Sequence, residues 1–327
     1  MTREIFYAEA IKEALIQEMK RDPSVYLFGE DVGHYGGVFG VTMGIKDEFK
    51  DDDLRVRDTP LSEMAILGEA VGSAVYGMRP VPEIQFADFI TVAMSQVVDL
   101  MAPYHYRVGT ALPITMRVPT GGMLHIGNFH SNCWENWFAH VPGLKIVVPS
   151  TAYDAKGLLV SAIRDNNPVL FLEQKKLYRN VKDDVPEELY EVPLGKARVV
   201  QEGKDVTIIS YGAMMPIIND LLPKLEEKGI SIELVDLRSI VPLDKETLLS
   251  SFRKTGRAVI VHEARKSCGF GGEIASILME EAFDDLVAPI IRVGSMQTPV
   301  PMSPNLEKAY LPQESEILEA CEKLMTY

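Results

Sequence analysis

Paired cysteines, long apolar runs and an excess of positive charge are all missing from this sequence. Three cysteines are scattered along 327 residues without a Cys-x-x-Cys pair, which excludes a disulfide framework and a zinc motif and is typical of a reducing cytosol. No apolar run reaches the roughly 18 residues of a membrane-spanning helix. The net charge of −14 disfavours nucleic acid and anionic membranes as partners. We therefore expect a cytoplasmic protein whose acidic surface either serves solubility or docks a basic partner.

The hydrophobic pattern predicts an α/β fold with two parallel-sheet domains. Residues Met1–Pro23 have helical periodicity rather than the apolar stretch of a signal peptide. Short runs rich in Val, Ile and Leu alternate with helical patterns, as in parallel sheets. The expected strands of the first domain are Val25–Phe28, Val81–Phe86, Ile114–Val118, Leu144–Val148 and Pro168–Leu172. Its expected helices are Glu63–Tyr76, Phe89–Tyr106 and Tyr153–Arg164.

A second α/β series follows an acidic stretch, Lys182–Val192, whose two prolines predict a linker. We accordingly divide the chain into residues 1–189 and 190–327. The expected strands of the second domain are Val206–Ser210, Ile232–Val235, Ala258–Val261 and Pro289–Val293. Its expected helices are Ile217–Lys228, Lys245–Lys254, Gly272–Phe283 and Glu314–Met325.

Two glycine-rich stretches invite interpretation as phosphate-binding loops. Gly33, Gly36, Gly37 and Gly40 follow the first strand, but their spacing matches neither a dinucleotide fingerprint nor a Walker loop. The glycines of the second stretch, Cys268–Gly272, favour a tight turn over a phosphate site. A non-catalytic module that binds a dinucleotide is therefore a weaker hypothesis, which saturable binding of NAD would support.

The expected helix from Glu63 carries Gly68 and Gly72 on one face. Glycine inside a helix costs about 1 kcal/mol relative to alanine, so their register predicts close helix packing, either within the chain or across subunits. From its position alone, Glu63 is a first-turn carboxylate beside a Ser62 or Thr59 cap.

The ordered motifs along the chain resemble those of the β-subunits of thiamine-diphosphate-dependent 2-oxoacid dehydrogenases. No single motif decides this resemblance, but their joint order covers essentially the whole sequence. The matching stretches are Gly29–Val32, Asp58–Glu63, Gly77–Pro80, His130-Ser131, Pro142–Lys145, Pro149–Thr151, Asp154–Leu158, Leu237-Arg238 and Pro304–Glu307. The resemblance implies a transketolase-like pyrimidine-binding domain followed by a transketolase carboxyl-terminal-like domain.

The resemblance also implies roles for individual side chains. The carboxylate at Glu63 would hydrogen-bond the N1′ atom of the cofactor's aminopyrimidine ring and so promote loss of the proton from thiazolium C2. Phe89 would pack on that ring, with Gln85 and Leu61 lining the pocket. His130 matches the active-site histidine that shuttles a proton or orients the lipoyl group. His125 and Trp134 depart from commoner members and leave the 2-oxoacid open.

A potassium ion is a further implication of the resemblance. In the family it is bound mostly by backbone carbonyls, and a helix end with exposed carbonyls plus a carboxylate can enclose a hard cation. From the residues alone this segment is an ordinary helix end. The matching positions are Ile114, Ala162, Ile163, Asp165 and Asn167.

One motif of this cofactor class is absent. The Gly-Asp-Gly sequence that helps hold Mg²⁺ and the diphosphate does not occur in the chain. The resemblance therefore implies an α-subunit that supplies the Mg²⁺ site, an α₂β₂ heterotetramer that includes a second β-subunit, and a lipoyl-bearing acyltransferase core. Acetoin cleavage by a similar β-subunit and a self-sufficient transketolase-like synthase are the alternative activities.

Overall fold

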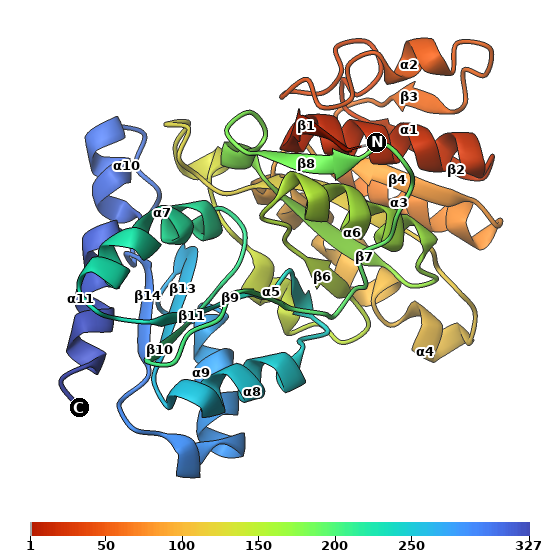
Figure 1. Ribbon diagram of the computed structural model, residues 1–327. Helices are drawn as coiled ribbons and strands as arrows, with labels where there is room; N and C mark the ends of the chain where they lie inside the picture. Colours follow the sequence, from red (N-terminus) through yellow and green to blue (C-terminus); the bar gives the residue numbers. More distant parts are fainter. Residues whose placement is uncertain (1) are drawn as a thin grey trace.

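The computed structural model describes residues 2–327 and places two α/β halves side by side, each built on its own sheet (Figure 1). The seven-stranded sheet has the order β12-β6-β7-β5-β4-β2-β3, and all its pairs are parallel except β12 with β6. Its strands are β2 (Val25–Gly29), β3 (Val56–Asp58), β4 (Arg79–Glu83), β5 (Thr115–Thr120), β6 (Lys145–Val147), β7 (Val169–Gln174) and β12 (Ser239–Val241).

The five-stranded sheet has the order β14-β13-β10-β11-β9, and only the edge strand β9 is antiparallel. The predicted α/β class with parallel sheets is thus confirmed, with antiparallel strands added at edges where no crossover helix is needed. The strands are β9 (Arg198–Gln201), β10 (Val206–Ser210), β11 (Ile232–Asp236), β13 (Ala258–Arg265) and β14 (Ile291–Ser295).

The long helices agree closely with the periodicity of the sequence. Side-chain caps begin two of them, since Thr151 accepts from the Asp154 amide and Asp244 accepts from the Thr247 amide. The long helices are α1 (Tyr7–Arg21), α3 (Glu63–Val75), α6 (Ala152–Arg164), α7 (Met214–Glu227), α8 (Lys245–Thr255), α9 (Gly271–Glu281) and α11 (Glu314–Leu324). Short helical segments are α2 (Ile45–Glu48), α4 (Tyr104–Val108), α5 (Glu135–Ala139), α10 (Pro304–Tyr310), η3 (Asn128–His130), η4 (Lys175–Leu177) and η5 (Phe283–Asp285).

The start of the chain and the expected linker both differ from the prediction. The amino-terminal helix begins only at Tyr7, because Thr2–Phe6 forms strand β1. Its antiparallel partner is β8 (Lys182–Pro186), so the first part of the predicted linker Lys182–Val192 is wrong. Charged residues and proline are common on short edge strands, where they prevent further pairing. Composition alone therefore does not separate such a strand from a linker.

The predicted single helix Phe89–Tyr106 is also wrong. The segment is divided into the 3-10 helix η1 (Ala87–Ala93), the π-helix η2 (Gln96–Met101) and α4. The Ala102 amide donates to the Val97 carbonyl at 3.0 Å, five residues back. Over two or three turns the apolar spacing of these helix types is similar, so the period does not distinguish them.

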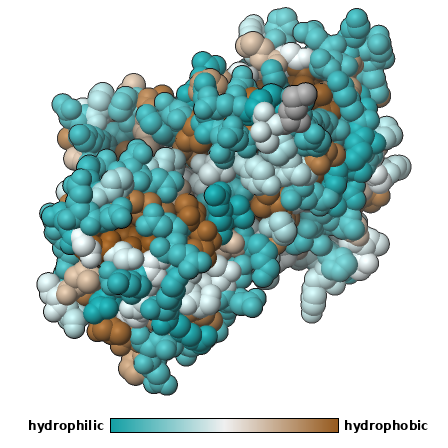
Figure 2. Space-filling model, in the orientation of Figure 1, coloured by the Kyte–Doolittle hydropathy of each residue, from teal (hydrophilic) through white to brown (hydrophobic). Residues whose placement is uncertain are grey.

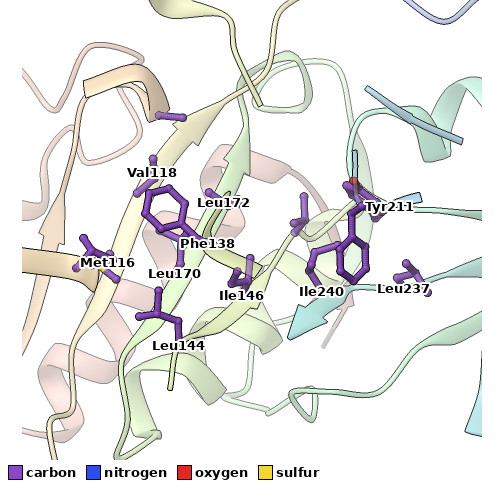
Figure 3. Packing of buried hydrophobic residues seen from close by; sticks show 14 of the residues in the cluster. Met116, Val118, Phe138, Leu144, Ile146, Leu170, Leu172, Tyr211, Leu237 and Ile240 are labelled. Atoms are coloured by element: carbon purple, nitrogen blue, oxygen red, sulfur yellow. The ribbon is translucent and has the colours of Figure 1, made fainter. Parts of the chain in front are cut away.

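The two halves share an apolar core. Phe138 and Leu144 pack in the same cluster as Tyr211, Leu237 and Ile240 of the second half (Figure 3). Strand β12 from the second half extends the first sheet at the same place. The second half is therefore packed directly against the first, and loops of one can be held by side chains of the other.

The surface is mostly hydrophilic on the face in Figure 2, with apolar patches between the hydrophilic regions. Among residues 2–327, no helix combines the length and the hydrophobicity that a membrane crossing demands.

Candidate active site

The candidate site residues gather at the carboxyl ends of adjacent parallel strands. Glu30 directly follows β2, and Gln85 lies two residues beyond β4, its neighbour in the sheet. Helix α3, which begins at Glu63, follows the next strand, β3. The chain leaves β2 and β4 in opposite directions, which makes this edge a topological switch point. Ligands of open α/β sheets bind in the crevice at such a point.

Glu63 and Glu30 form a pair of nearly buried carboxylates. Glu63 is only 6% exposed and Glu30 only 7%. Burial raises the pKa of Glu30, and the charges of Glu63 and Asp31 raise it further. Within residues 2–327, the Glu63 carboxylate makes no hydrogen bond or ion pair. The oxygens of both carboxylates still reach solvent, since neither is among the fully buried unpartnered atoms of residues 2–327, so this pair is open to a ligand that shares a proton.

Aromatic rings lie around His130, another candidate residue of the site. The His130 ring lies edge-on to Phe86 at a centroid distance of 4.5 Å and to Phe89 at 5.5 Å. The Lys175 ammonium lies 5.7 Å from the centre of the Phe86 ring, and burial lowers its pKa to about 8. The His130 ring is therefore packed edge-on against two aromatic side chains, which fix its orientation. The structure thus brings together two predicted residues, Phe89 and His130.

The other predicted pocket residues lie at the same sheet edge with less contact. Gln85 is half-buried between β4 and η1, and Leu61 is 81% exposed just before α3. In a single chain, such an exposed leucine lines no closed pocket. The cofactor contacts of Gln85 and Leu61 remain predictions.

Comparisons with known proteins identify the family of this chain. The transketolase pyrimidine-binding domain matches residues 3–181, and the transketolase carboxyl-terminal domain matches residues 195–317. The pyruvate dehydrogenase E1 component subunit beta of Bacillus subtilis (strain 168) is 46% identical over 321 residues, which cover 98% of both chains. The chain belongs to the β-subunit family of the 2-oxoacid dehydrogenases.

Further relatives agree with this assignment. The 2-oxoisovalerate dehydrogenase subunit beta of the same organism is 44% identical and covers 98% of both chains. A solved structure of a split-gene transketolase, an inactive β₄ tetramer, superposes with a TM-score of 0.79 over 98% of this chain and 99% of that one. Its identity of 23% makes this a likeness of fold alone. The family uses thiamine diphosphate, and the relatives support the 2-oxoacid dehydrogenase activity rather than the acetoin alternative.

The residues of this β-subunit fit the aminopyrimidine end of thiamine diphosphate. The ring needs a carboxylate at N1′ and an apolar surface for its face. Glu63 supplies a buried carboxylate without a protein partner, and Phe89 supplies an aromatic ring. Two amides of the glycine-rich loop, by contrast, already have a partner within the protein. Asp58 accepts hydrogen bonds from the Gly33 amide at 2.6 Å and the His34 amide at 3.1 Å. Those amides therefore serve the fold rather than a phosphate, as the spacing of the glycines predicted.

Sequence reasoning missed three carboxylates of this β-subunit. Glu30 and Asp58 lie within matched motifs but received no role, and Glu307 ends another such motif. Glu30 lies directly after β2, Asp58 ends β3 and Glu307 ends a Pro-Asn-Leu-Glu stretch, and these positions were the available signals. What pairs them with their targets is the tertiary structure.

The predicted potassium ligands lie close together, but positively charged side chains of the protein already contact two of them. Arg79 donates to the carbonyl oxygens of Ile163 at 2.9 Å and Asp165 at 3.0 Å, and Lys145 pairs with the Asp165 carboxylate. The Ile114 carbonyl accepts from the Val169 amide at 2.9 Å. In this conformation these oxygens do not form an open cage for a cation. Potassium binding at Ile114, Ala162, Ile163, Asp165 and Asn167 stays a prediction.

A buried ion-pair network lies beneath the site and joins three strands of the β-subunit. Arg117 on β5 bonds Glu173 on β7 through both Nε (2.7 Å) and Nη2 (2.8 Å), and its Nη1 bonds Glu83 on β4. Its side chain is fully buried. Burial alone would lower the pKa of Arg117, but Glu173 and Glu83 outweigh it and raise that pKa. Tyr178 donates to Glu173 at 2.7 Å and completes the network, which fixes the strand ends that carry the site.

A groove of about 400 Å³ opens beside the loop that carries His130. Asn128, Asn132 and Cys133 from that loop line it, together with Trp134 and Arg265. The indole nitrogen of Trp134 is buried without a hydrogen-bond partner among the described residues, while Arg265 lies 5.9 Å from the ring. Trp134, one of the two departures from commoner members, thus lines this groove next to the His130 loop.

Proposed function

We propose that this β-subunit, together with an α-subunit, catalyses the thiamine-diphosphate-dependent oxidative decarboxylation of a 2-oxoacid and the reductive acylation of a lipoyl group. The observation that carries the proposal is the buried, unpartnered Glu63 carboxylate beside Glu30 at the carboxyl edge of the sheet. The proposal needs a ligand with a proton-sharing ring at this place, and the transketolase pyrimidine-binding domain is named for such a ring.

Three side chains would hold the cofactor's ring and its proton. When bound, thiamine diphosphate supplies the electron sink that decarboxylation of a 2-oxoacid requires. Glu63 shares a proton with ring atom N1′, and Glu30 lies close enough for its own pKa to rise in response to Glu63. Phe89 packs on the ring face, a contact worth about 0.5–1.5 kcal/mol beyond area burial.

The α-subunit would complete the site from outside this chain. Apart from Glu69, the exposed residues of α3 and its C-cap are small or apolar: Met64, Val75 and Tyr76 are 39%, 52% and 93% exposed. No atom outside the local backbone comes within 4 Å of a Cβ placed at Gly72, so packing inside the chain does not explain this glycine. Exposed apolar helix faces with small residues fit a protein interface. We infer an α₂β₂ assembly in which the α-subunit holds Mg²⁺ and the diphosphate and a second β-subunit packs nearby.

The substrate is a 2-oxoacid, either pyruvate or a branched-chain one. Both activities occur among relatives of similar identity. Assays of the assembled enzyme with pyruvate, 2-oxoisovalerate and acetoin, each with a lipoyl acceptor, distinguish the substrates; turnover of acetoin alone would contradict the proposal. We also propose that residues 190–327 form a domain of their own, which offers acidic surface to an acyltransferase core.

Replacing His130 by alanine is expected to lower acyl transfer to lipoamide about a hundredfold, because the positioned proton donor is lost. Decarboxylation measured with an artificial electron acceptor should fall much less. The matched control is His140→Ala, since His140 is exposed and outside the aromatic cluster. A variant that loses only thermal stability would contradict the role of His130.

A further inference from the structure

The loop that carries His130 is held by the other half of the molecule. Residues 121–132 connect β5 to the turn before α5, and the second half contacts this loop at both ends. Near its start, the Gly122 amide donates to the buried carboxylate of Glu263 on β13 at 2.5 Å. Near its end, Arg265 donates to the Asn132 side chain at 2.9 Å. The conformation of the loop therefore depends on residues more than one hundred positions away.

Glu307 makes the most extensive of these contacts. Its carboxylate is fully buried and accepts hydrogen bonds from the Met123 and His125 amides, both at 3.0 Å. The same carboxylate pairs with Nδ1 of His125 at 2.5 Å. Two oxygens of one side chain thus hold three groups of the loop.

The loop backbone is strained where Glu307 holds it. Met123 and His125 have φ angles of 66° and 61°, in the left-handed region that residues other than glycine rarely adopt. The Met123 and His125 amides, two residues apart, both donate to one anion, which here is a carboxylate of the protein itself. Strained backbone persists only where its surroundings enforce it, and the Glu307 carboxylate supplies three of the contacts that do so here.

Glu307 is itself well anchored. It lies on α10, whose Tyr310 and neighbouring Leu311 are buried in a small cluster with Val300. The Met296 amide donates to the Tyr310 carbonyl at 3.1 Å and ties this segment to the end of β14. The helix therefore offers a fixed support against which the loop is ordered.

The far end of the loop is tied to the aromatic cluster. The Asn132 amide donates to Asp88 at 3.3 Å, and Asp88 is the neighbour of Phe89 on η1. Between this tie and the Glu307 contacts, the His130 ring reaches Phe86 and Phe89. A shift of residues 123–125 would consequently move His130 relative to the rings that orient it.

We propose that Glu307 is a positioning residue, which holds the His130 loop from the second half so that the imidazole is presented at the active site. The inference rests on the proposed function, since it explains how His130 is set for acyl transfer. Glu307 touches neither substrate nor cofactor in this account. Its effect passes through the backbone of residues 123–130.

The test uses the assembled enzyme with Glu307→Ala, Glu307→Gln and the control Glu319→Ala, an exposed glutamate of α11. Hydrogen exchange of the amides in residues 122–132 is expected to accelerate about tenfold in Glu307→Ala, while β13 and α11 exchange as in the wild type. Glu307→Gln keeps an acceptor oxygen but not the charge, so its exchange should be intermediate. The kcat for acyl transfer should fall in the same order, with the KM for the 2-oxoacid unchanged.

Unchanged exchange in residues 122–132 of Glu307→Ala would overturn the inference whatever the activity. Faster exchange with undiminished acyl transfer would overturn it too, provided that His130→Ala is impaired. If His130→Ala itself transfers acyl groups normally, the proposed function of His130 fails. The exchange measurement still decides whether Glu307 orders the loop, so the two failures are distinguishable.

Discussion

Replacing Glu63 by glutamine is expected to lower decarboxylation by about a thousandfold while the subunits still assemble. The amide keeps the size of the side chain but does not share a proton with a ring nitrogen, and general acid–base catalysis contributes about 10²–10⁴-fold. Because Glu63 has no hydrogen bond or ion pair among residues 2–327, the substitution breaks no contact of the fold. Steady-state turnover with saturating thiamine diphosphate and Mg²⁺ measures the effect.

A matched control for this variant is Glu314→Gln. Glu314 also lies in the first turn of a helix, but it is exposed and pairs with Lys224 at 2.8 Å. Its loss should leave turnover near the wild-type value, and size-exclusion chromatography should find both variants in the complex. Near-normal turnover of Glu63→Gln would refute the proton-sharing role.

Replacing Arg117 by methionine is expected to destabilise the chain by about 3–5 kcal/mol, the range for breaking one side of a buried ion pair. The substitution leaves Glu83 and Glu173 facing each other without a cation in a buried site. Thermal unfolding followed by circular dichroism measures the change. The control is Lys228→Met, which removes a half-exposed pair with Glu322 and should cost about 1 kcal/mol or less.

The loss in Arg117→Met should depend on pH. Burial already raises the pKa of Glu83, although Arg117 opposes that rise. Without Arg117 this pKa rises further, and a group whose folded pKa exceeds its unfolded value stabilises the fold only at low pH. The deficit of the variant should therefore grow as the pH rises from about 5 to 8. A deficit that is constant over this range would show that lost packing, not unpaired charge, dominates.

The fold was predictable where local signals and the tertiary structure agree. Strand β10 occupies the predicted residues, Val206–Ser210, because a buried parallel strand needs apolar residues on both faces. Strand β8 and the helical segments from Ala87 to Val108 were not predictable in the same way. Their form depends on a partner strand or on subtle hydrogen-bond shifts that residue types do not specify.

The candidate site residues could be named from the sequence only because the family resemblance supplied their motifs. Glu63 and His130 are ordinary in isolation: a first-turn carboxylate and a loop histidine. The burial of Glu63 beside Glu30 and the packing of His130 on Phe86 emerge from the fold. The contact of Glu307 with the loop was not predictable, since the two meet only when the two halves pack together.

The most direct test is a structure of this β-subunit assembled with its α-subunit, thiamine diphosphate and Mg²⁺. The account predicts an oxygen of the Glu63 carboxylate about 2.7–3.2 Å from N1′ of the aminopyrimidine ring, in a cleft between the two subunits. A Glu63 side chain turned into solvent, or a cofactor ring held elsewhere by other residues, would contradict it.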